Sequence, residues 1–348
     1  YPVTLGIIAV LASGQGADDG RFATSPYASA LLLMTAYASS VGGIATPIGT
    51  ATNVVAMGYF RRPEFFGQAP DYLRWCVIGV PMMLLILVGL IAWLRLRAPA
   101  AGLDLPALRV YLRQQNSSLG AWKVGEVNTL VVFLLVVGLW VTPGVLALTA
   151  TPDTRKVFSD HFPEEVVALL APIVLCTLPV NWRRREFTLD VTDFLKVDWA
   201  TILLFGSAVS LGGLMFKTGL AQHAGERVFA WLGTNDVWLI TAVAIACGIL
   251  LSEFTSNVAA VTTLLPVILA ICRQANVDPM PPVLGVTFAA SFGSALPVST
   301  PPNAIVYGSR LIPVRRMIVA GIGLDIVCGV VIWLVLRLAF SLGYSPIS

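Results

Sequence analysis

The stretch from Ser252 to Pro266, SEFTSNVAAVTTLLP, places polar side chains inside one of the most apolar parts of the chain. Asn257 has an amide oxygen that can bind a cation and an amide N–H that can bind an anion. Hydroxyl groups precede it at Ser252, Thr255 and Ser256, and Glu253 adds a carboxylate. Polar groups in a membrane segment are costly and mark ion or substrate pathways. The cluster therefore predicts a combined cation and anion site.

Two further stretches, Pro47 to Gly58 (PIGTATNVVAMG) and Pro297 to Gly308 (PVSTPPNAIVYG), match one another. Proline, threonine, asparagine and glycine coincide at their first, fourth, seventh and twelfth positions, and Gly49 coincides with Ser299. Both stretches interrupt apolar segments that should cross the membrane in opposite directions. Inverted repeats with broken helices at corresponding positions indicate a secondary transporter.

A helix that breaks at mid-membrane exposes free N–H groups on one half and free carbonyls on the other. Such groups are tolerated only where they are buried in protein or line a wet cavity. The N-terminal ends attract anions, whereas carbonyls and hydroxyls coordinate cations. Thr300 before Pro301 is suited to begin a half-helix, and Ser256 before Asn257 is suited to cap another. The breaks therefore supply the same two kinds of site.

The composition places the whole chain in a membrane. Of 348 residues, 57% are hydrophobic and 12% are charged, and the mean hydropathy is +0.82. Soluble domains carry about 25% charged residues. The net charge of +3 is small and its basic residues lie in loops, so nucleic-acid binding is not indicated. The five cysteines form no CxxC pair and no hydrolase or metalloprotease motif is present, so the sequence does not indicate an enzyme. We expect an all-α polytopic membrane protein.

The segment 237–272 is expected to be a re-entrant hairpin. Its apolar runs Val237–Leu251 and Val258–Ile271 have 15 and 14 residues, each too short to cross. As one helix they would extend on the order of 50 Å, against a hydrocarbon core of roughly 30 Å. With a hairpin the Lys and Arg residues divide 13 to 9 across the membrane, and with one span 12 to 10. The positive-inside rule therefore favours the hairpin.

Apolar runs and amphipathic stretches outline the remaining elements. Spans are expected at Cys76–Leu94, Val127–Leu148, Val166–Val180 and Ala200–Phe216, and helices lying in the interface around 105–112 and 187–195. The expected organisation along the chain is a stub at 1–12, a broken helix at 26–60, spans at 76–180, an interfacial helix and span at 183–217, the hairpin at 237–272, a second broken helix at 282–308 and a last span at 317–341.

EFTSNVAAVTTLLPV, ASFGSALPVSTPPNAIVYGS and GGIATPIGTATN resemble the divalent anion/sodium symporter family in the order of its motifs. The resemblance implies a homodimer of scaffold and transport domains with an elevator-like mechanism. It also implies two hairpins tipped by Ser-Asn-Thr, of which 1–12 would be the second arm of the first. On this basis 76–180 becomes scaffold. The missing tip is expected about eight residues upstream of Tyr1, in a complete protein with on the order of 100–150 further N-terminal residues. The 348 residues alone are then not expected to transport.

The resemblance also assigns the site residues. One Na⁺ would be held by Ser252, Thr255, Asn257 and the carbonyl of Ser299, and the other by the carbonyl of Gly49. The substrate carboxylate would contact Ser256, Asn257, Val258, Thr300, Pro301 and the repeat-related Thr50. The sequence departs from the family pattern in having Val258 where threonine is commonest, and Ala51-Thr52 in place of Pro-Pro.

The resulting expectation is a multi-pass protein of the bacterial inner membrane. It would couple Na⁺ to uptake of a di- or tricarboxylate of the succinate, malate, fumarate or citrate type. An exchanger or a sulfate-type permease on the same fold is the alternative, and a channel or an intramembrane enzyme is the alternative of another class. Glu253 is expected to be paired structurally inside the hairpin, in preference to substrate or proton coupling, and Asp325 to be a structural hydrogen-bonding group.

Overall fold

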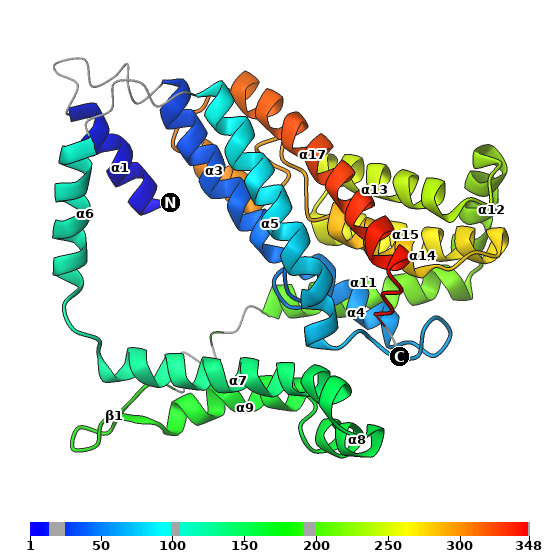
Figure 1. The fold of residues 1–348 in the computed structure, drawn as a ribbon, viewed down its shortest axis with the longest axis horizontal. Helices are drawn as coiled ribbons and strands as arrows, with labels where there is room; N and C mark the ends of the chain where they lie inside the picture. Colours follow the sequence, from blue (N-terminus) through cyan, green and yellow to red (C-terminus); the bar gives the residue numbers. More distant parts are fainter. Residues whose placement is uncertain (14–24, 99–104, 191, 193–195, 197–198, 347–348) are drawn as a thin grey trace.

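The computed structural model describes residues 1–13, 25–98, 105–190, 192, 196 and 199–346, and is mostly helical there (Figure 1). Its elements are α1 (Pro2–Ser13), α3 (Pro26–Gly43), α4 (Ala51–Phe60), α5 (Tyr72–Arg97), α6 (Leu105–Leu119), α7 (Val124–Thr149), α8 (Pro152–His161), α9 (Glu164–Thr177), β1 (Pro179–Asn181), β2 (Glu186–Phe187), α11 (Trp199–Lys217), α12 (Leu220–Leu232), α13 (Val237–Phe254), α14 (Asn257–Ala275), α15 (Met280–Ala289), α16 (Pro301–Tyr307) and α17 (Val314–Ser341).

Within the described ranges, 5 helices are long and apolar enough to cross a membrane, namely α5, α7, α13, α14 and α17. The pair α11 and α12, bent by 73° at their junction, passes the same test together and gives a sixth. The prediction of an all-α polytopic membrane protein is confirmed.

Several helices begin where a side chain satisfies a free backbone N–H. Ser25 accepts from Ala28 N at 3.1 Å at the start of α3, and Asp71 accepts from Arg74 N at 2.8 Å at the start of α5. Asp236 does the same for α13, accepting from Trp238 N at 2.9 Å. These are preferred N-cap residues, so local sequence fixes where these helices start.

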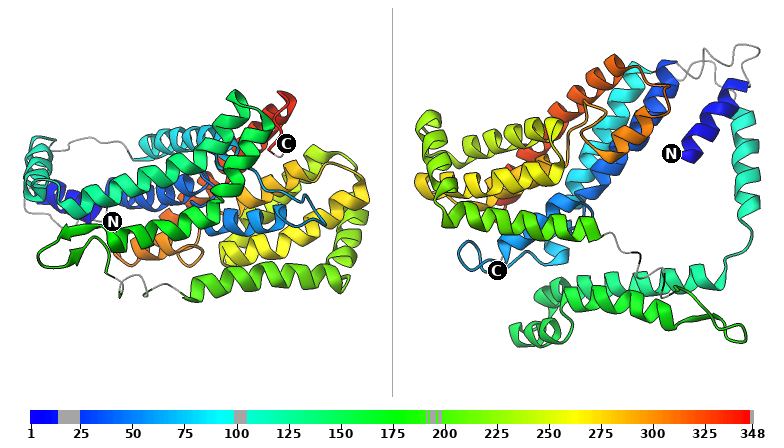
Figure 2. Two further views of the ribbon diagram at one scale, coloured as in Figure 1. Left: turned by 90° about the horizontal axis from the view of Figure 1, so that it is seen from below. Right: turned by 180° about the vertical axis from the view of Figure 1, so that it is seen from behind.

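The helices form two groups, seen from three sides in Figures 1 and 2. In the larger group, α3, α5 and α17 lie side by side, and α13, α14 and α15 pack beside them. The smaller group contains α7, α8 and α9, and α6 connects it to the end of α5. It contacts the larger group through Trp140 of α7, whose ring centroid lies 5.5 Å from that of Tyr72 of α5.

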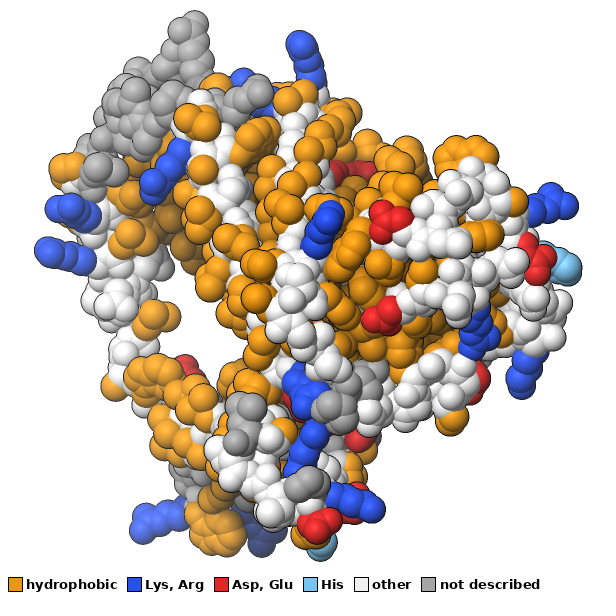
Figure 3. Space-filling view, turned by 45° about the vertical axis from the view of Figure 1, so that its right-hand side comes forward, with side chains coloured by type: hydrophobic (Ala, Val, Ile, Leu, Met, Phe, Trp, Pro, Cys, Tyr) orange, Lys and Arg blue, Asp and Glu red, His pale blue; other side chains and the backbone are white. Residues whose placement is uncertain are grey.

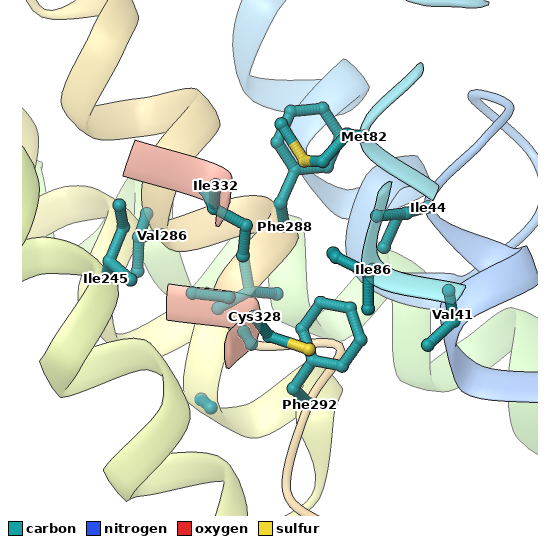
Figure 4. Close-up of a cluster of buried hydrophobic side chains, with 14 of the residues drawn as sticks. Val41, Ile44, Met82, Ile86, Ile245, Val286, Phe288, Phe292, Cys328 and Ile332 are labelled. Carbon is teal, nitrogen blue, oxygen red and sulfur yellow. The ribbon is translucent and has the colours of Figure 1, made fainter. Parts of the chain in front are cut away.

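A single large apolar core holds the first group together. Figure 4 shows Ile86 of α5, Phe288 of α15, and Cys328 and Ile332 of α17 meeting in its centre. All four are at most 1% exposed. Within a membrane, close packing of such side chains holds helices together through van der Waals contacts. Ile44 and Phe292, which lie in the two helix breaks, belong to this core.

Large apolar side chains also cover the outside of the helices, as the space-filling view shows (Figure 3). Examples are Val88 of α5, Leu135 of α7 and Ile326 of α17, which are 64%, 62% and 63% exposed. A soluble protein rarely exposes contiguous apolar patches of this kind. The surface is the one that a lipid bilayer covers.

Two expectations about individual elements are wrong. Phe187 lies in β2, because Pro179–Asn181 pairs with Glu186–Phe187 in an antiparallel ladder, so no helix begins there. The rest of that expected interfacial helix, Val191, Phe194 and Leu195, lies outside the described residues. The segment Val166–Val180 is not one helix either, since α9 ends at Thr177. Its 14 residues extend about 21 Å, too little to cross.

The arms expected for the hairpin are also longer than the apolar runs suggested. Helix α13 continues through Ser252 and Glu253 to Phe254, and α14 begins at Asn257, so the arms have 18 and 19 residues. The argument that each arm is too short to cross is therefore wrong. The two helices lie side by side, joined only by Thr255 and Ser256 (Figure 1).

Two glycines let helices approach the breaks closely. At Gly321 of α17 a Cβ atom would overlap the backbone of Ser294 and Ala295. At Gly79 of α5 it would lie 2.7 Å from the carbonyl oxygens of Ile44 and Ala45. Residues 45 and 295 are equivalent in the two repeats. Each break therefore packs against a glycine of the second helix that follows it, α5 for the first break and α17 for the second.

We predict that Gly321→Ala destabilises the protein by about 1–3 kcal/mol, because the backbone of the break must move to admit a methyl group. Gly138→Ala is the matched control, since no atom lies within 4 Å of a Cβ there. Thermal unfolding in detergent measures both. Equal melting temperatures for the two variants would contradict the close packing of α17 on the break.

Candidate functional site

The break of the second repeat, residues 290–300 between α15 and α16, is held by the side chain of Asn303. Its Nδ2 donates to the carbonyl of Gly293 at 3.1 Å and to that of Leu296 at 3.2 Å. Ser299 Oγ donates to the same two carbonyls. Side chains thus replace the backbone hydrogen bonds that a continuous helix would have supplied.

The break of the first repeat, residues 44–50 between α3 and α4, has the same arrangement. Asn53 Nδ2 donates to the carbonyl of Gly43 at 3.2 Å and to that of Thr46 at 2.8 Å. Asn53, Gly43 and Thr46 are the repeat equivalents of Asn303, Gly293 and Leu296, each offset by 250 residues. The internal match in sequence therefore corresponds to a match in hydrogen bonding.

Both asparagines leave an oxygen without a partner. Asn53 and Asn303 are 0% and 1% exposed, and Oδ1 of each has no hydrogen-bond donor within the described residues. Turning either amide round would place Oδ1 against the carbonyls that Nδ2 now satisfies, so the orientation is fixed by its partners. A buried oxygen acceptor without a donor is costly unless a cation or water approaches it. The two breaks thus present equivalent oxygen atoms suited to a cation.

The junction between α13 and α14 meets the second break. Ser252 Oγ donates to Asn257 Oδ1 at 2.7 Å and to the carbonyl of Ala290 at 2.9 Å. Asn257 Nδ2 donates to the carbonyl of Ser291 at 3.3 Å. Ser256 caps α14, its Oγ accepting from Ala259 N at 3.2 Å. The tip formed by Ser252, Thr255, Ser256 and Asn257 is therefore fastened to the break at residues 290–291.

The first break joins the same assembly through α4. Thr52 Oγ1 and Ser291 Oγ lie 2.6 Å apart, and both side chains are buried. Ser291 therefore contacts the tip through its carbonyl and the first repeat through its hydroxyl. Three segments far apart in the sequence converge on this one residue.

Glu253 has a partner other than the expected one. Its Oε1 accepts from Ala295 N at 2.8 Å and its Oε2 from Leu296 N at 3.0 Å. The carboxylate thus binds backbone N–H groups of the second break and not a group inside the hairpin. Asp325 of α17 lies beside it and beside Ser294. Glu253 thus links α13 to the second break.

The residues predicted to bind Na⁺ lie in two places, most of them around the tip and the second break, and Gly49 in the first break. Asn257 and Ser252 contact each other at the tip, and Ser299 lies in the adjacent break. Thr255 Oγ1 instead donates to the carbonyl of Leu251 at 2.9 Å, as hydroxyls in membrane helices commonly do. Gly49 lies in the other break, beside Thr50.

The residues predicted to contact substrate occupy helix starts. Thr50 and Thr300 are the N-caps of α4 and α16, and Pro301 is the first residue of α16. The Thr50 hydroxyl makes no capping bond, whereas Thr300 Oγ1 accepts from Asn303 N at 3.4 Å. Val258 is 6% exposed and packs in the apolar core.

Sequence reasoning assigned no role to Asn53, Asn303, Thr52 or Ser291. The signal for the asparagines was present, because they are the seventh residues of the two matching stretches. For Thr52 the only signal in the sequence is that it replaces a proline of the family pattern. Ser291 carried no signal, since its importance comes from contacts with distant segments.

A bundle of membrane helices with two symmetry-related breaks around a polar tip is the architecture of secondary transporters. The chain belongs to the family described as the sodium:sulfate symporter transmembrane region, whose sequence profile matches residues 1–342. This confirms the resemblance seen in the motifs. The family and the relatives below are transporters and not enzymes.

The curated relatives include proteins named sodium-dependent dicarboxylate transporter SdcS. The one from Staphylococcus saprophyticus is 29% identical over 338 residues, which are 96% of this chain and 63% of that protein. The one from Staphylococcus aureus is 28% identical with the same coverage. The chain therefore spans less than two thirds of the length of these relatives.

We predict that Asn303→Asp destabilises the protein by about 1–3 kcal/mol, because it replaces the amide donor of the second break with an oxygen facing carbonyl oxygens. Asn53→Asp should have a similar effect. The exposed Asn116→Asp of α6 is the control. Thermal unfolding compares the stability of the three variants. An Asn303→Asp protein as stable as the control would contradict the conclusion that Asn303 holds the second break together.

Proposed function

We propose that this protein couples Na⁺ to the uptake of a small di- or tricarboxylate of the succinate, malate, fumarate or citrate type. The observation that carries the proposal is that the tip, through Asn257, and the first repeat, through Thr52 of α4, both contact Ser291 of the second break. The names of the relatives support sodium and dicarboxylate as the transported species. An elevator-like movement of the larger helix group against the smaller one completes the proposal.

Sodium ions would bind at the two breaks. One Na⁺ would use oxygens of Ser252, Thr255 and Asn257 and the carbonyl of Ser299, and the other the carbonyl of Gly49. The unpartnered Oδ1 atoms of Asn303 and Asn53 lie on the same two segments and are available to complete these sites. Hard cations prefer such neutral oxygen ligands.

The substrate would bind between the tip and the starts of α4 and α16. Its carboxylates would meet Ser256, Asn257, Thr50, Thr300 and Pro301, with Val258 shaping the apolar side of the pocket. Residues 44–50, 252–258 and 290–301 contain no Lys or Arg. The charge of a dianion would then be compensated by bound cations and by the N-terminal ends of the half-helices, since burying an uncompensated charge is strongly unfavourable. Na⁺ coupling is therefore a physical expectation of the proposal, although an exchanger could rely on helix dipoles and hydroxyls.

We further propose that the protein works as a homodimer in the plasma membrane of a bacterium. The description of the matched family names sulfate, whereas the relatives are named for dicarboxylates. Sulfate therefore has to be tested as a substrate beside succinate, and exchange has to be tested beside symport.

Uptake of labelled succinate into proteoliposomes that contain the full-length protein tests the proposal. We expect accumulation that requires an inward Na⁺ gradient, and we expect Asn257→Ala to reduce it at least tenfold, because that substitution removes a proposed ligand of both ion and substrate. Asn116→Ala, at an exposed position of α6, should transport normally.

Three results would contradict the proposal. Succinate entry that ignores Na⁺ and requires internal dicarboxylate would identify an exchanger. Uptake of sulfate that succinate does not inhibit would identify a sulfate permease. Near-normal uptake by Asn257→Ala would show that the tip is not the binding site.

A further inference from the structure

A polar cavity lies far from the tip. Its volume is about 930 Å³, and it is bounded by the loop after α4, by α11, by the start of α12 and by the last turns of α14. Its polar lining includes Arg62, Glu64, Lys217, Gln222, Arg273 and Gln274. Arg273 follows Asn257 by 16 residues on α14, or about 24 Å along the helix. The cavity is therefore separate from the proposed transport site.

Positive charge dominates this cavity. Three cationic side chains face it, from Arg62, Lys217 and Arg273, and Glu64 is the one carboxylate in its described lining. No ion pair joins any of the three to a carboxylate in the part of the chain that the structure describes. Lysine and arginine without anionic partners attract anions into a concave site.

The two arginines are held in place by neutral groups. Arg62 donates from one terminal nitrogen to the carbonyl of Val209 at 2.6 Å, and Arg273 donates likewise to the carbonyl of Glu64 at 2.5 Å. A guanidinium has five N–H donors, so most donors of each remain available. An arginine fork binds carboxylate or phosphate oxygens in pairs.

The surrounding residues preorganise these side chains. Arg273 lies over the rings of Phe65 and Phe216, 5.1 Å and 5.6 Å from their centroids. Arg62 fits because residue 213 is glycine. A Cβ atom at position 213 would lie 2.9 Å from a guanidinium nitrogen of Arg62. Preorganised donors lose less freedom when a ligand binds.

We propose that this cavity is a second anion-binding site, which takes the carboxylate or phosphate oxygens of a small dianion between Arg62, Lys217 and Arg273. A lipid phosphate offers the same chemistry, but the free dianion is the occupant assigned here. If the proposed transport function holds, the site gathers substrate before it reaches the tip. The binding itself does not depend on that function.

Direct binding without Na⁺ tests the site. Purified protein in uncharged detergent is mixed with labelled succinate or inorganic phosphate in choline buffer. We expect both anions to bind, and binding to weaken when the salt is raised from about 20 mM to about 300 mM. Lys217→Gln, which removes a charge that makes no ion pair, should weaken binding about tenfold. Arg227→Gln is the control, since Arg227 is exposed on α12 and outside the cavity.

The variants separate this site from the transport site. Asn257→Ala should retain Na⁺-independent binding, and Lys217→Gln should retain Na⁺-dependent uptake with a raised KM. Equal binding by Lys217→Gln and Arg227→Gln would overturn the proposal without affecting the proposed function. Loss of binding in Asn257→Ala would place the anion at the tip and also overturn it. In nanodiscs, binding of phosphatidylglycerol with no binding of succinate or phosphate would overturn the free-anion assignment.

Discussion

The structure depends on satisfying backbone groups where two helices break inside a membrane. No water is available in hydrocarbon to hydrogen-bond a free carbonyl, so the protein must supply the donors itself. Asn303 and Asn53 do this with the same two bonds in each repeat. Because their N–H groups are committed to carbonyls, their oxygens are left over. The solution to a folding problem thus creates the polar atoms of the proposed ion sites.

The other parts of the site follow from keeping these breaks in place. Glu253 binds two backbone N–H groups of the second break, and Tyr37 of α3 donates its hydroxyl to the carbonyl of Ser294 at 2.9 Å. Gly79 and Gly321 let α5 and α17 cover the breaks at short range. The polar network is therefore embedded in the apolar core.

The sequence was sufficient to predict the membrane fold class, the two breaks and the polar tip. These depend on hydropathy, proline and a short internal match, all of which are local signals. It was insufficient for the length of α13, because Ser252 and Glu253 continue a helix once tertiary contacts satisfy them. It also placed Phe187 in a helix. The spacing of apolar residues that favoured a helix carries no information about the pairing of Pro179–Asn181 with Glu186–Phe187, which makes β2. The partners of Asn257 and Ser291 could not be predicted, because they come from segments that only the fold brings together.

Protection of a cysteine at the tip tests the central claim most directly. Ser256 is exposed, so Ser256→Cys in a background without the native cysteines can react with a maleimide, and Ser118→Cys on α6 provides a reference rate. The account predicts that Na⁺ with succinate slows labelling at position 256 and leaves position 118 unchanged, because ions and substrate bind between the tip and the breaks. Labelling of position 256 at the same rate with and without Na⁺ and succinate would contradict it.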